Sequence, residues 1–176
     1  MMFVDVTILD KQSLRIRGKN SSFVIDPGVE ISKVAADAVL LLKDSKNDQG
    51  ILRVTDYRVI IKGAGEYEVA GVRILVTKSD ENFLYSLNVD NVGVLTARTS
   101  GLSKTQEAGD YNILILNVDC EFKETMVTGF SPSAVLLYGE KSEGALKMLG
   151  KKASKSQKFS MSADKLPAEM QVIILS

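Results

Sequence analysis

The amino-acid sequence predicts a mixed α/β protein in which β-strands dominate. Up to about residue 97 the chain reads as short strands separated by turns, and from about residue 98 strands alternate with helices. The 176 residues are 45% apolar and 25% charged, which is ordinary for a globular protein. We therefore expect a single domain of residues 1–176, with either one mixed sheet and outer helices or two such sheets packed face to face.

The strands of the first part are predicted from apolar and β-branched runs bounded by turn residues. Leu14 and Ile16 alternate with Arg15 and Arg17, which is typical of a half-buried strand. The apolar run 38–42 has polar residues at both ends and indicates a strand buried on both faces. The expected strands of this part are 4–9, 13–17, 22–25, 38–42, 59–61, 66–70, 72–77, 83–88 and 92–96.

The second part has the rhythm of strands alternating with helices. Ser103 is a suitable N-cap for a short helix over 103–108, and the segment 121–127 is compatible with another. A third helix is predicted over Ser142–Leu149, where Gly150 would end it. The expected strands of this part are 113–116, 134–138, 159–161 and 172–175.

Charge and cysteine content exclude several classes of protein. The 22 basic and 22 acidic residues give zero formal net charge, which argues against a general binder of nucleic acid or anionic membranes. A single cysteine excludes an intrachain disulfide and favours a reducing compartment. The longest apolar runs are too short to span a bilayer, and the start has no basic segment of a signal peptide. We expect a cytoplasmic protein.

The chain contains no histidine. This absence removes the Ser-His-Asp and Cys-His mechanisms and every imidazole metal ligand. Because only one cysteine is present, a zinc site built from imidazole and thiolate is also excluded.

Three segments carry a resemblance to a known family. Residues 36–49, A-D-A-V-L-L-L-K-D-S-K-N-D-Q, resemble without a gap the signature loop A-D-x-V-L-x-T-H-x-H-x-D-H of the metallo-β-lactamase fold. Residues 23–27 are similar to its I-D-P segment, and residues 63–72 to its G-P-G-E-Y-E-V-x-G-V stretch. The most similar branch is that of the ascorbate-phosphate-lactonase-like zinc hydrolases. The resemblance covers nearly the whole chain and implies a four-layer αββα sandwich, in which two mixed sheets pack face to face between outer helices. Because this chain is shorter than most members of the family, some of these elements are expected to be shortened.

The same resemblance shows where the family's metal ligands are missing. The three loop histidines correspond to Lys43, Ser45 and Asp48, and the loop aspartate to Asn47. The other ligand positions correspond to Lys11, Thr96, Thr99 and the pair Leu137-Tyr138. Zinc hydrolysis depends on a metal-bound hydroxide, so without these ligands the resemblance implies the fold but neither the zinc nor the mechanism.

Three functions remain open at this point. The favoured one is a non-catalytic binding or assembly module, for which a homo-oligomer is expected. The second is a hydrolase of phosphate esters or lactones with a rebuilt carboxylate site that would suit Mg²⁺, Ca²⁺ or Mn²⁺. Its candidate ligands are Asp26, Asp44, Asp48 and Glu66. Lys43 in the same loop opposes a bound cation by like charge.

The third function is binding of nucleic acid or an acidic partner through a basic stretch. This stretch comprises Lys147, Lys151, Lys152, Lys155 and Lys158. A solvated helix end and loop is the more ordinary meaning of such a pattern, so nucleic acid is not the expected partner.

Three further side chains are candidates for a functional role. Cys120 lies between Asp119 and Glu121, whose charges oppose thiolate formation, so we expect it to be structural. Tyr67 and Tyr85 fit either an exposed interface or an alternating strand, and the sequence does not separate the two.

Overall fold

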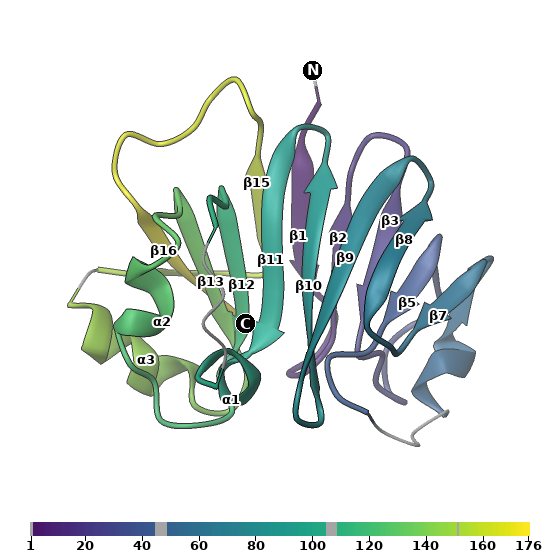
Figure 1. Ribbon diagram of the computed structural model, residues 1–176, viewed down its shortest axis with the longest axis horizontal. Helices are drawn as coiled ribbons and strands as arrows, with labels where there is room; N and C mark the ends of the chain where they lie inside the picture. Colours follow the sequence, from purple (N-terminus) through teal and green to yellow (C-terminus); the bar gives the residue numbers. More distant parts are fainter. Residues whose placement is uncertain (1, 45–48, 105–108, 151) are drawn as a thin grey trace.

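The computed structural model describes residues 2–44, 49–104, 109–150 and 152–176. Two mixed sheets pack face to face (Figure 1). The first sheet contains, in spatial order, β15 (Lys158–Met161), β1 (Val4–Ile8), β2 (Leu14–Arg17), β3 (Ser22–Ile25), β5 (Ala38–Leu40) and β7 (Val59–Ile61). The second contains β14 (Ser154–Ser156), β16 (Gln171–Leu175), β13 (Ala134–Tyr138), β12 (Ile113–Asn117), β11 (Val92–Arg98), β10 (Asn82–Val89), β9 (Val72–Ser79) and β8 (Gly65–Val69). The prediction of two mixed sheets is confirmed.

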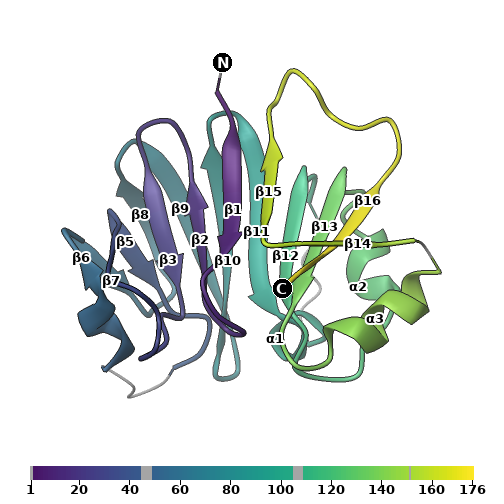
Figure 2. The same cartoon turned by 180° about the vertical axis from the view of Figure 1, so that it is seen from behind.

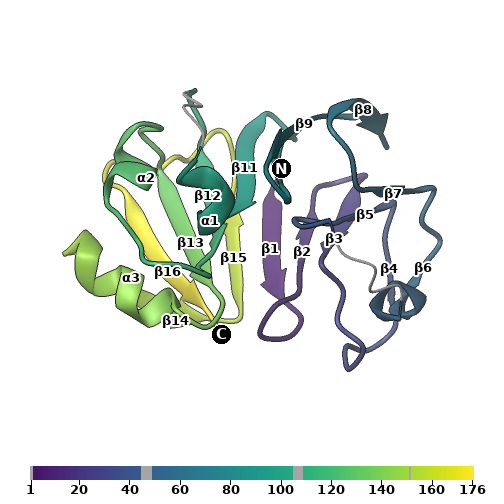
Figure 3. The same cartoon turned by 60° about the horizontal axis from the view of Figure 1, so that its bottom comes forward.

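The outer layers are unequal. Helices α1 (Thr99–Leu102), α2 (Thr125–Thr128) and α3 (Ser142–Leu149) gather beside β12, β13 and β16 (Figure 3). At the opposite end the first sheet is covered by the 3₁₀-helix η1 (Gly50–Arg53) and the small sheet of β4 (Val34–Ala35) and β6 (Val54–Thr55). Figure 2 shows β14 crossing from α3 toward β15. Within the described residues, no helix has the length and apolarity to cross a membrane.

Most predicted elements are present with small shifts at their ends, but the first helix is displaced. A helix was expected over 103–108; α1 instead spans Thr99–Leu102, and residues 105–108 lie outside the described part of the chain. The reason is tertiary: Asp119 accepts hydrogen bonds from the Ser100 amide and the Thr99 hydroxyl, so the helix begins there and not at Ser103. The helix compatible with 121–127 is limited to α2.

The pleat of the central strands divides the core into two parts. Along β12, Ile113 and Ile115 point between the sheets, whereas Leu114 and Leu116 point toward the helices. Both sets are completely buried. This explains why β12 and β13 read as continuous apolar runs in the sequence.

Tyr85 connects the two sheets. Its hydroxyl, at the end of a buried β10 side chain, lies 2.6 Å from the carbonyl oxygen of Leu41 and 2.8 Å from that of Ile61. Leu41 follows β5 and Ile61 ends β7, so one side chain of the second sheet donates to the backbone of the first. Burial raises the pKa of Tyr85, and the charge of Asp26 adds to this rise. The hydroxyl therefore stays protonated and remains a donor.

The hairpin of β8 and β9 offers a stabilising substitution. Ala70 and Gly71 form its two-residue turn with φ of 50° and 75°. The left-handed region costs an L-residue roughly 1–2 kcal/mol, and asparagine is the residue favoured before glycine in such a turn. We expect Ala70→Asn to raise the free energy of unfolding by about 0.5–1 kcal/mol in urea titrations. Ala163→Asn, in a turn without positive φ, is the control and should bring no gain.

Candidate functional site

The candidate site begins as a row of polar residues at the ends of three adjacent parallel strands. Arg98 on β11 is in register with Asn117 on β12, and Asn117 with Tyr138 on β13. The pleat places these three side chains on the face that packs against the first sheet. Gly139, with φ of 95°, follows Tyr138, and a Cβ there would lie 2.7 Å from Asn117 Oδ1. A polar row thus ends an otherwise apolar interior.

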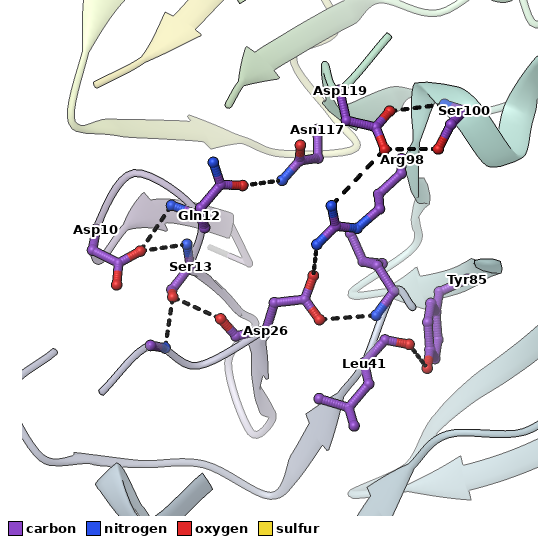
Figure 4. A network of polar contacts seen from close by, with 12 residues as sticks. Asp10, Gln12, Ser13, Asp26, Leu41, Tyr85, Arg98, Ser100, Asn117 and Asp119 are labelled. Atoms are coloured by element: carbon purple, nitrogen blue, oxygen red, sulfur yellow. Dashed lines mark hydrogen bonds and ion pairs between the residues drawn. The ribbon is translucent and has the colours of Figure 1, made fainter. Parts of the chain in front are cut away.

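The first sheet contributes the groups opposite this row (Figure 4). Asp26 follows β3 with a φ of 44°, and its Oδ2 lies 3.4 Å from Arg98 Nη2. Its Oδ1 accepts a hydrogen bond of 3.0 Å from the Leu42 amide. Asn117 Nδ2 donates to Gln12 Oε1 at 2.9 Å. The contact between Arg98 and Asp26 and that between Asn117 and Gln12 therefore join the two sheets at the same end of the sandwich.

A second carboxylate lies on the other side of Arg98. Asp119 Oδ2 is 3.9 Å from Arg98 Nη1 and accepts from Ser100 Oγ at 2.7 Å. Its Oδ1 accepts from the Ser100 amide at 2.9 Å and from Thr99 Oγ1 at 3.0 Å. The side chains of Arg98, Asp26 and Asp119 are 22%, 15% and 25% exposed, so one largely buried cation lies between two largely buried acids.

The turn between β1 and β2 holds Asp26 in place. Ser13 Oγ donates to the Asp26 carbonyl oxygen at 2.6 Å and accepts from the Gly28 amide at 2.8 Å. Asp10 Oδ1 accepts from the amides of Gln12 and Ser13, which fixes the turn itself. Ser13 thus bonds to the backbone at Asp26 and at Gly28 and stabilises the left-handed conformation of Asp26.

Burial and hydrogen bonding shift the two acids in opposite directions. Burial raises the pKa of Asp26, and the Leu42 amide and Arg98 offset only part of this rise. Burial would also raise the pKa of Asp119, but hydrogen bonds from Ser100 and Thr99 outweigh it and leave that pKa lowered. Burial raises the pKa of Tyr138, whose hydroxyl lies beside Asn117 without meeting hydrogen-bond geometry.

Solved structures identify the fold. A proposed Zn-dependent hydrolase of the metallo-β-lactamase superfamily from Thermotoga maritima superimposes over 98% of both chains, with a TM-score of 0.76 and 16% identity. This chain has the metallo-β-lactamase fold. A proposed metal-dependent hydrolase from Parabacteroides distasonis covers 98% of this chain and 94% of its own, with a TM-score of 0.61 and 15% identity.

A third structure is more distant, and the sequence comparisons find no match. A metallo hydrolase from the archaeon Ignicoccus hospitalis covers 91% of this chain and 99% of its own, with a TM-score of 0.57 and 10% identity. No protein-family model matches the chain, and no curated protein matches it significantly. All three are described as metal-dependent hydrolases, the first of them as a member of the metallo-β-lactamase superfamily, and at these identities the likeness establishes the fold alone.

The described residues do not fit the zinc that the metallo-β-lactamase fold implies. Lys43 pairs with Glu81 at 3.4 Å, and Thr96 is completely buried with no hydrogen-bond partner for its hydroxyl. Ser45 and Asp48 lie outside the described residues. Over residues 2–44, 49–104, 109–150 and 152–176, no three Cys, Asp or Glu side chains gather to hold a metal ion. Arg98 adds a fixed positive charge that would repel a dication.

The predicted carboxylate ligands are distributed over different places. Asp26 belongs to the cluster around Arg98. Asp44 is exposed, and its amide donates to the Glu81 carbonyl oxygen; Glu66 is exposed on β8. Asp48 lies outside the described residues. In the described part of the chain, none of these acids joins two others in a metal-binding group.

The basic stretch is partly neutralised within the chain. Lys155 pairs with Glu143, and Lys158 pairs with Asp5 at 3.1 Å. Lys147 lies in the last turn of α3, and Lys152 is exposed; Lys151 lies outside the described residues.

Cys120 is an unpaired thiol, and its Sγ donates to Thr99 Oγ1 at 3.3 Å beside the cluster.

Sequence reasoning missed the central residues of the site. Arg98, Asn117 and Gln12 were not singled out, and Asp119 was considered only as a neighbour of Cys120. A signal for two of them was present: Arg98 and Asn117 are polar residues at the carboxyl ends of apolar strands that read as neighbours in a parallel sheet. Carboxyl ends of such strands are where functional groups collect.

The lowered pKa of Asp119 predicts an acid-sensitive contribution to stability. Folding favours its ionised form, so the contribution is complete above the ordinary value of 3.8 and is lost as the pH falls through the lowered pKa. Urea midpoints below about pH 4 should therefore fall more steeply for the wild type than for Asp119→Asn. Ser100→Ala, which removes one of the donors, should lie between them. Parallel curves for all three proteins would contradict the prediction.

Proposed function

We propose that this protein is a non-catalytic binding or assembly module with a metallo-β-lactamase fold, related to the ascorbate-phosphate-lactonase-like branch. The observation that carries the proposal is the position of Arg98 between Asp26 and Asp119 at the strand ends. A guanidinium group has no acceptor and cannot ligate a metal ion. Its positive charge compensates the two acids, which would otherwise attract a metal ion.

The hydrogen bonds and ion pairs that Asp26 and Asp119 already form support the same proposal. Asp26 accepts from the Leu42 amide and pairs with Arg98. Both oxygens of Asp119 accept from Ser100 or Thr99. An acid engaged in this way would have to break existing hydrogen bonds to become a ligand. The residues corresponding to family ligands, Lys43, Ser45, Asp48 and Thr96, include only one carboxylate and no imidazole.

Elemental analysis of the purified protein tests the proposal. We expect much less than one equivalent of metal, both as purified and after incubation with Zn²⁺ or Mn²⁺ followed by dialysis. One tightly held equivalent would overturn it. If that metal and a hydrolytic activity on phosphate esters or lactones both disappeared in Asp44→Ala and Asp48→Ala, the rebuilt carboxylate site would replace the present proposal.

The assembly and the cellular location are part of the proposal. We expect a homo-oligomer, which light scattering coupled to size-exclusion chromatography measures directly. A monomer at all accessible concentrations would leave binding, without self-assembly, as the function of the module. The single unpaired cysteine supports a reducing compartment, for which we propose the cytoplasm.

A further inference from the structure

Two adjoining hollows open beside the polar cluster. The first, about 350 Å³, is lined by Gln12, Arg98, Asn117, Asp119, Lys141 and other residues. The second, about 600 Å³, is lined by Ile8, Leu9, Lys11, Ser142, Leu175 and others. Glu140 lines both hollows, so a polar chamber lies next to a more apolar one.

The polar chamber contains donors that the protein leaves partly unused. Arg98 approaches Asp26 at 3.4 Å and Asp119 at 3.9 Å, and both distances are long for charge-assisted hydrogen bonds. Its Nε is buried without a hydrogen-bond partner in the described structure. The acids, in contrast, receive shorter bonds from Leu42, Ser100 and Thr99. Donor capacity exceeds acceptor capacity around this guanidinium group.

The charges at the rim limit a ligand to at most one negative charge. Lys11 and Lys141 form no ion pair with any described residue. Asp10 and Glu140 line the same hollows, also without an ion pair in the described part of the chain, and Glu143 there pairs with Lys155. The N-terminus of the eight-residue helix α3, at Ser142, lines the second hollow and adds a partial positive charge. Asp26, Asp119 and Glu140 would repel a dianion more strongly than a monoanion.

The second hollow selects the rest of the ligand. Ile8 and Leu9 are half-buried and, with Leu175, form an apolar wall that continues away from Arg98. A ligand that fits both chambers needs an anionic head and an apolar body. We infer that the two hollows bind a small monocarboxylate with an apolar tail, its head directed toward Arg98 and Lys141. This inference rests on the proposed function, because a metal at the cluster would change the charge that selects the head.

Amide NMR of the ¹⁵N-labelled protein tests the inference with hexanoate as the probe. We expect saturable shifts around residues 9–12, 117–119 and 139–143. Hexanol, which lacks the charge, and inorganic phosphate, which lacks the tail, should bind at least about tenfold more weakly. No saturable shift with hexanoate, or equal binding of either comparison compound, would overturn the inference.

A matched pair of variants locates the head group. Lys141→Glu reverses a charge at the polar chamber and should weaken hexanoate binding by about fivefold or more, whereas Lys152→Glu reverses an exposed charge elsewhere and should leave it unchanged. Equal effects of both would overturn the assignment. The titration is repeated with EDTA: binding that is seen without EDTA and lost with it would contradict the proposed function, whereas absence of binding in both titrations would contradict this inference alone.

Discussion

Replacing Arg98 with methionine is expected to lower the free energy of unfolding by about 2–4 kcal/mol. Methionine keeps much of the apolar stem and removes the charge that lies between Asp26 and Asp119. Removal of one partner from a fully buried ion pair costs roughly 3–5 kcal/mol, because the other charge is left uncompensated. The lower range applies here because the three side chains retain some exposure to water, at 22%, 15% and 25%.

A double variant separates the charge from the packing. Asparagine at position 26 keeps an oxygen for the Leu42 amide, tolerates the left-handed backbone and needs no counter-charge. Asp26→Asn combined with Arg98→Met should therefore be more stable than Arg98→Met alone. Arg17→Met is the control: Arg17 is 53% exposed and its partner Asp5 keeps Lys158 as a second cation, so the loss should cost at most about 1 kcal/mol. Equal losses for Arg98→Met and Arg17→Met would contradict the structural role of the cluster.

The same variant has a pH signature. Burial already raises the pKa of Asp26 in the folded protein, and removing Arg98 takes away an interaction that lowers it. Folding then favours the protonated acid still more, so stability is lost as the pH rises through this pKa. The deficit of Arg98→Met should be smallest in acid and grow toward neutral pH, which urea titrations at several pH values would measure. A deficit independent of pH would indicate lost packing alone.

Tyr85→Phe is expected to lower the free energy of unfolding by about 1–3 kcal/mol. The substitution keeps the ring and removes the hydroxyl that donates to the backbone of the first sheet. The Ile61 carbonyl oxygen also accepts from the Leu41 amide, so the principal loss falls on the Leu41 carbonyl oxygen. A buried acceptor left without its donor costs about that amount.

Tyr138→Phe supplies a matched comparison at the other buried tyrosine. Tyr138 is also completely buried, but its hydroxyl has no hydrogen-bond partner in the described structure. Removing it should be neutral or slightly stabilising, because an unsatisfied buried hydroxyl is itself unfavourable. Urea titrations of both variants measure the two changes in the free energy of unfolding. Similar losses in Tyr85→Phe and Tyr138→Phe would show that the contact between Tyr85 and Leu41 contributes little.

The parts of the fold that were predictable depend on local sequence. Alternation at Leu14–Arg17, the apolar run of β13 and the capped segment Ser142–Leu149 each reflect a period or boundary within a few residues. Helix α1 was misplaced because its start depends on Asp119, twenty residues away in the chain. Tyr85 could not be assigned to core or surface because its partners, Leu41 and Ile61, lie in another sheet.

The sequence by itself determined most of the strands, the helix Ser142–Leu149 and the absence of imidazole ligands, because periodicity and composition need no knowledge of contacts. Only the tertiary structure decided which polar side chains meet at the ends of β11, β12 and β13. Arg98 and Asp26 are separated by 72 residues, and Asn117 and Gln12 by 105. Their meeting depends on the register of β11, β12 and β13 and on the packing of one sheet against the other, which no local pattern specifies. That packing places an arginine between two acids at the end of the sandwich.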